Sequence, residues 1–168
     1  MPRFHATTLR HSEPMKRLLS RTRDGLPQWS GDLGSTFANL AELVAYWRTT
    51  GVKHFAIVED SKERFTQVLV TAKGFVVCEV QSNLFLPEEL HWNDDQLRQI
   101  DDLGFTPPTS EDTCGYCNHW SYDEGDNAAT KAVLMMQRAM FGPFGLSRTA
   151  PAKLIISSPA ALPKQLSA

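Results

Sequence analysis

Two cysteines separated by two residues form the motif in this sequence that most resembles a reactive site. The motif reads Cys-Gly-Tyr-Cys, from Cys114 to Cys117. Such a pair exchanges disulfides when a helix start lowers the pKa of the first thiol. Here the pair lies in a polar stretch between Pro108 and Asn118, with no predicted strand before it and no clear helix after it. This context argues against a thioredoxin-like site and leaves unreactive loop thiols, a redox pair and a metal site as alternatives.

The metal alternative adds the histidine that follows the second cysteine. Cys114, Cys117 and His119 would give three ligands on one loop. A structural zinc ion takes four ligands in tetrahedral geometry. Because the sequence has no second cysteine pair of this kind, the fourth ligand would come from His91, Cys78 or a partner chain. The alternative function is therefore a thiol-redox or zinc-binding protein that uses this loop, whereas the leading interpretation has no cofactor.

The rest of the sequence offers no pattern typical of catalysis. It contains no HExxH motif, no Ser-His-Asp order and no glycine-rich phosphate loop. The acidic pairs Asp94-Asp95 and Asp101-Asp102 fall on a predicted helix, where solvated charge is the usual role of such residues. We therefore predict a protein that is not an enzyme and has no catalytic residues.

Length, charge and cysteine content narrow the class of protein. A chain of 168 residues with 42% hydrophobic residues predicts one folded domain. A net charge of −2 predicts no general affinity for nucleic acid or membranes, and no apolar run is long enough to cross a bilayer. The three cysteines form no disulfide framework, and the N-terminus has no apolar signal core. We therefore expect a cytoplasmic protein.

The charge is uneven along the chain, and this suggests three segments. Residues 1–30 hold six Lys and Arg against two acidic residues, a net +4, whereas the rest holds 11 against 17, a net −6. We predict a basic arm containing Pro and Gly at 1–34, a folded domain at 35–145 and a C-terminal tail at 146–168. The arm is expected to bury little apolar surface.

A β-hairpin organises the predicted domain. Its two arms, 64–72 and 75–81, are rich in β-branched and aromatic residues, which suit strands. Lys73-Gly74 lies between the arms, and glycine readily takes the positive φ of a tight turn. A further strand at 52–58 precedes the hairpin, so the three strands are expected to form a meander.

Helices are predicted before and after this meander. Apolar periodicity and helix-end signals predict three helices, at 35–50, 93–103 and 126–141. A short strand is expected at 118–122. The order is then helix, three-strand meander, helix, short strand or loop, helix. This order predicts an α+β fold, an antiparallel sheet with helices on one side.

The second arm of the hairpin has two different faces. Alternation places Val76, Cys78 and Val80 on the face expected to pack on the helices. The opposite face mixes apolar and hydrogen-bonding side chains, a composition expected where a chain of variable sequence is held. The alternatives are that solvent, a dimer partner, the arm or the tail covers this face. The predicted peptide-binding surface consists of Phe75, Val77, Glu79, Gln81 and Phe85.

Several short motifs follow one another as they do in a known family. They are Glu-Val-Gln-Ser-Asn-Leu-Phe-Leu at 79–86, Leu-Gly-Phe at 103–105 followed by Pro107-Pro108, Asn-His-Trp at 118–120, and Phe-Gly at 141–142. In this order and spacing, residues 35–145 resemble the type III secretion chaperone-like and YbjN peptide-binding chaperone family (TY-Chap), in its actinobacterial group. The family's usual aromatic residue after Leu-Gly is Trp, where this chain has Phe105. The cysteine loop is not part of the family pattern.

The resemblance implies a chaperone-like α+β domain, often dimeric, that binds a peptide or an unfolded segment of another protein. It implies no catalytic residues, in agreement with the motif analysis. We therefore expect a homodimer with a polypeptide client, captured on exposed apolar surface or at a sheet edge with unpaired main-chain groups.

Overall fold

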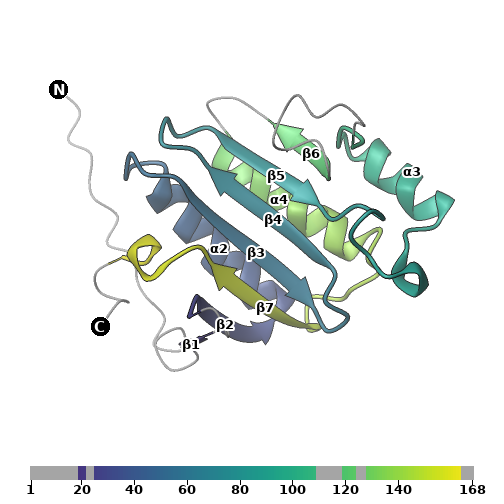
Figure 1. Ribbon diagram of the computed structural model, residues 1–168, viewed down its shortest axis with the longest axis horizontal. Coiled ribbons are helices and arrows are strands. Elements are labelled where there is room, and N and C mark those ends of the chain that lie inside the picture. Colours follow the sequence, from purple (N-terminus) through teal and green to yellow (C-terminus); the bar gives the residue numbers. More distant parts are fainter. Residues whose placement is uncertain (1–18, 22–24, 109–118, 124–127, 164–168) are drawn as a thin grey trace.

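One antiparallel sheet of seven strands forms the centre of the protein (Figure 1). The computed structural model describes residues 19–21, 25–108, 119–123 and 128–163. Across the sheet the strands are ordered β1 (Leu19–Arg21), β2 (Pro27–Asp32), β7 (Pro151–Ile156), β3 (His54–Asp60), β4 (Phe65–Val70), β5 (Val76–Val80) and β6 (Trp120–Asp123). The predicted meander is present as β3, β4 and β5.

The hairpin between β4 and β5 closes where the sequence predicts it. Val70 pairs with Val76, and the Gly74 N–H donates to the Thr71 carbonyl at 2.9 Å. Gly74 has a φ of +83°, a left-handed value that residues with a Cβ rarely adopt. The glycine therefore lets the strands reverse direction, which sets the register of the hairpin.

The described residues form three α-helices, of which two cover one face of the sheet. These are α2 (Leu33–Trp47) and α4 (Ala128–Phe141), which lie behind the sheet in Figure 1. The third, α3 (Asp94–Asp102), lies beside β6. It begins with a capping box: the Asn93 side chain accepts from the Gln96 backbone N–H, and the Gln96 side chain accepts from the Asn93 backbone N–H. The prediction of an α+β fold with this element order is confirmed.

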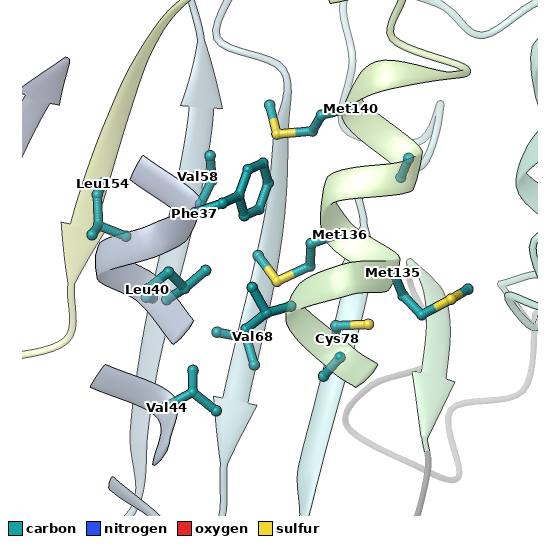
Figure 2. Packing of buried hydrophobic residues seen from close by; sticks show 14 of the residues in the cluster. Phe37, Leu40, Val44, Val58, Val68, Cys78, Met135, Met136, Met140 and Leu154 are labelled. Carbon is teal, nitrogen blue, oxygen red and sulfur yellow. The ribbon is translucent and has the colours of Figure 1, made fainter. Parts of the chain in front are cut away.

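The core lies between the two helices and the sheet. Figure 2 shows side chains of α2 and α4 meeting over the inner face of the strands. Met136 and Met140 are fully buried there, as is Cys78 of β5. The methionines therefore belong to the core, where flexible side chains fill irregular space. Each large side chain buried in this way stabilises the fold by roughly 1.5–3 kcal/mol.

The sheet extends beyond both predicted boundaries of the domain. Residues 27–32 of the expected arm form β2, and residues 151–156 of the expected tail form β7 between β2 and β3. Trp29 of β2 is only 3% exposed and belongs to the core. The expectation that the arm buries little apolar surface is thus wrong for β2. The arm is inferred from net charge, and net charge gives no information about whether a single tryptophan is buried.

Gly31 shows how closely Trp29 is packed against its own strand. A Cβ added to Gly31 would lie 2.3 Å from the nearest carbon of the Trp29 ring. Real atoms do not approach so closely, so the glycine makes room for the ring to lie flat along the strand. The sequence Trp-Ser-Gly therefore has a packing role in β2.

Candidate functional site

The face of the sheet opposite α2 and α4, named here the free face, holds the candidate site. Strand β3 alternates buried and half-buried side chains, and the buried ones point toward the helices. No α-helix within the described ranges lies over the opposite face (Figure 1). The free-face residues of the three central strands are Phe55, Ile57 and Glu59 on β3, Phe65, Gln67 and Leu69 on β4, and Val77 and Glu79 on β5.

Apolar side chains from adjacent strands stand side by side on the free face. The register places Leu69 of β4 between Phe55 of β3 and Val77 of β5. In the next row, Ile57 pairs with Ile155 of β7. Phe55, Val77 and both isoleucines are half-buried, so each keeps apolar area exposed. Leu69, between Phe55 and Val77, is 8% exposed, so the accessible apolar area of the free face comes from the half-buried side chains around it.

A polar pair interrupts the apolar rows at the centre of the free face. Gln67 and Glu79 are register partners, and the Gln67 Nε2 donates to the Glu79 Oε2. Glu79 is 3% exposed, and its Oε1 has no hydrogen-bond partner among the described residues. Burial raises the pKa of Glu79 above its ordinary value of 4.5, against the opposing effect of the Gln67 hydrogen bond. Glu79 is therefore a carboxyl held in unusually dry surroundings.

An aromatic cluster lies at one end of the free face, next to the segment that follows β5. The His119 ring lies 5.7 Å from the Phe65 ring and 4.8 Å from the Phe85 ring, measured between centroids. The Ser82 N–H donates to the His119 Nδ1 at 3.3 Å, so the proton of the neutral imidazole lies on Nε2. Burial lowers the pKa of His119, which favours this neutral form. The histidine thus joins Phe85 to the sheet.

The structure distributes the five predicted peptide-binding residues unevenly. Phe75 and Phe85 are 48% and 52% exposed, and Val77 is half-buried. Glu79 and Gln81 are buried. The Gln81 Oε1 accepts from the Phe65 N–H at 3.2 Å, and the Gln81 Nε2 donates to the Phe85 carbonyl at 3.4 Å. Gln81 therefore supports the position of Phe85.

Sequence reasoning missed a buried cluster beside the turn between β3 and β4. Arg64 contacts the Asp60 Oδ2 at 2.7 Å, and both side chains are almost fully buried. The guanidinium carbon lies 5.2 Å from the ring centroids of both Trp92 and Phe144. The local sequence shows only an acid and an arginine four residues apart, since both rings come from distant segments.

Trp92 connects this cluster to the end of strand β5 and the segment that follows it. Its Nε1 donates to the Gln81 carbonyl at 2.7 Å. Its backbone N–H donates to the Asn83 Oδ1 at 2.7 Å, and its carbonyl accepts from the Asn83 Nδ2 at 3.1 Å. The segment 82–92, which carries Phe85, is therefore held at both of its ends.

The residues of the metal alternative are only partly visible. Cys114 and Cys117 lie outside the described residues. To coordinate a metal through Nδ1, His119 would have to lose the hydrogen bond that Ser82 donates to that atom. To coordinate through Nε2, it would have to carry its proton on Nδ1 instead. Cys78 points into the core, and the His91 Nε2 donates to the Leu86 carbonyl at 3.0 Å. Cys78 and His91 are thus both engaged in the fold, and a partner chain is the remaining suggested source of a fourth ligand.

Replacing Cys114 and Cys117 together by serine is expected to leave stability within about 0.5 kcal/mol of the wild type, as for ordinary surface changes. The reason is the sequence context, a polar stretch with no clear helix start and no fourth local ligand. Thermal unfolding of both proteins, with metal analysis of the wild type, checks this. Stoichiometric zinc in the wild type, together with a large fall in melting temperature for the variant, would establish the metal alternative instead.

One edge of the sheet is partly occupied. Thr106 and Ser121 of β6 exchange two backbone hydrogen bonds of 2.7 and 2.9 Å on the outer side of that strand. The opposite edge strand, β1, spans only three residues. Short or covered edges offer few main-chain groups for an added strand. The edges of the described sheet therefore offer little room for an added strand.

The described chain is thus an α+β domain with helices on one face of an antiparallel sheet. A family model matches residues 36–154, well over half of the chain. The chain belongs to this family, TY-Chap3, described as type III secretion system (YopN, CesT) and YbjN peptide-binding chaperone 3. A search with this chain gives no significant match among curated proteins or among solved structures. Within the described ranges, no helix is long and apolar enough to cross a membrane.

Proposed function

We propose that this protein is a non-enzymatic chaperone that captures an extended segment of a client polypeptide on the free face. The observation that carries the proposal is the apolar row of Phe55, Leu69 and Val77, which no helix of the described chain covers. Membership of a family of peptide-binding chaperones supports the same function. A homodimer and a cytoplasmic location, both expected from the sequence, remain part of this proposal.

The mechanism is the burial of client side chains against this face. An extended segment projects alternate side chains to one side, so every second residue can contact the sheet. Phe75 and Phe85 are exposed near its two ends and extend the apolar surface beyond the central rows. Each apolar client side chain that becomes fully buried contributes about 1.5–3 kcal/mol before the cost of ordering the segment. Such contacts select apolar content and tolerate variation in sequence.

Val77→Asp tests whether the free face is the capture surface. The variant places a charge at the end of the apolar row while leaving the helix-facing side of β5 unchanged. We expect its affinity for a fluorescein-labelled, unfolded apolar peptide to fall at least about tenfold, which corresponds to 1.4 kcal/mol. Fluorescence anisotropy measures the affinity, and circular dichroism during heating verifies that the variant remains folded.

Leu134→Asp provides a matched control on the opposite layer. Leu134 is 39% exposed on α4, where it lines a shallow groove between α2 and α4. We expect this variant to bind the peptide as the wild type does. Loss of binding in Leu134→Asp with retention in Val77→Asp would move the capture surface to the helices. If Val77→Asp unfolds, Phe75→Ser gives the same test at a more exposed position.

A further inference from the structure

Glu79 is an anomaly on a surface that otherwise attracts apolar groups. The residue is only 3% exposed, yet only one of its two carboxyl oxygens has a described hydrogen-bond partner. A buried acceptor without a partner costs the folded protein about 1–3 kcal/mol. A glutamine at this position would keep the shape at lower cost. The carboxyl is therefore poorly explained by stability alone.

The neighbours of Glu79 on the free face are uncharged. Its register partners are Gln67 on β4 and Ser121 on β6, and Val77 and Gln81 flank it along β5. The cations of the surrounding strands are engaged elsewhere, because Lys153 pairs with Glu59 at 3.3 Å and Arg64 with Asp60. The described chain thus surrounds an acidic group with apolar and neutral polar groups, and no cation of its own is paired with that group.

This arrangement is complementary to one kind of side chain. Lysine and arginine carry a cation at the end of a long apolar stem, and the stem can lie on apolar surface while the cation reaches an acceptor. A stem crossing Val77 would bring its cation toward the Glu79 carboxylate. In these dry surroundings, a cation and a carboxylate attract each other more strongly than in water.

Resting on the proposed function, we propose that Glu79 makes the free face selective for client segments with a lysine or arginine flanked by apolar residues. Contact requires a side chain at the centre of the face to move. Gln67 is half-buried, has three rotatable bonds before its amide, and can swing outward from Glu79. The arriving cation then takes its place at the carboxylate, and the flanking client residues lie on the apolar rows.

The test combines two synthetic peptides with two forms of the protein. Both peptides have eleven residues alternating valine and serine, one with a central lysine and the other with a central methionine. We expect the wild type to bind the lysine peptide at least about tenfold more tightly in fluorescence anisotropy, and Glu79→Gln to bind both peptides about equally. Glu79→Gln is expected to melt no lower than the wild type, since it removes a buried acid.

Glu59→Gln serves as the control for net charge. Glu59 lies on the same face two strands away, and the change also removes one negative charge. It should retain the preference for the lysine peptide. Equal binding of both peptides by the wild type, which is measured without any variant, would overturn the selectivity. It would leave the proposed capture on the free face intact. An unchanged preference in Glu79→Gln would overturn it as well. If the wild type binds neither peptide, the proposed function fails and the selectivity fails with it.

Discussion

Replacing Arg64 by methionine is expected to lower the free energy of unfolding by about 3–5 kcal/mol, because it leaves the buried Asp60 carboxylate without its cation. Methionine keeps much of the apolar stem but removes the planar cation that lies against the Trp92 and Phe144 rings. It also removes the bond from the guanidinium to the Phe144 carbonyl, 3.3 Å long. Chemical denaturation of both proteins measures the loss.

A double variant separates the unpaired charge from the lost packing. Asp60→Asn combined with Arg64→Met leaves no buried charge, and the asparagine oxygen can still accept from the backbone N–H groups of Lys62 and Arg64. We expect the double variant to be more stable than Arg64→Met alone. A loss below about 1 kcal/mol in the single variant would show that the ion pair is dispensable.

Trp29→Ala is expected to lower the free energy of unfolding by about 3–5 kcal/mol, the usual cost of truncating a buried aromatic side chain. Trp29 stands opposite Leu154 of β7 in the sheet register, and its removal leaves a cavity that Gly31 cannot fill. Deletion of residues 1–30 should cost at least as much, because it also removes most of β2. Thermal and chemical unfolding measure both effects.

Trp29→Phe is the matched control for the aromatic ring. The indole Nε1 is buried without a hydrogen-bond partner among the described residues. Phenylalanine therefore loses some ring area and no described bond, and we expect a smaller loss than for alanine. If the alanine variant were as stable as the wild type, β2 would contribute nothing and the charge-based division of the chain would be correct.

Local chemistry predicted the elements whose signals are local. The strand composition around Lys73-Gly74 predicted the meander, and helix-end signals predicted a helix from residue 93, as the structure confirms. In each case, the residues that determine the element lie within a few positions of one another.

The parts that sequence reasoning missed depend on contacts between distant segments. In the sequence Arg64 looks like an ordinary charged residue, because nothing local indicates that Trp92 and Phe144 lie against its guanidinium. Alternation correctly assigned Glu79 and Val77 to the same strand face. It could not predict that Glu79 would be buried, since that depends on the neighbouring strands β4 and β6.

The place of β7 has a consequence for how the chain is made. Synthesis delivers β2 early and β7 late, yet β7 lies between β2 and β3 in the finished sheet (Figure 1). While the chain is still growing on the ribosome, the meander can form, but β2 has only the three-residue strand β1 to pair with. Long-range pairing of this kind slows folding and exposes intermediates to aggregation. A chain stalled before residue 151 therefore presents the unpaired strands and apolar surface that a chaperone recognises, and is itself a potential client.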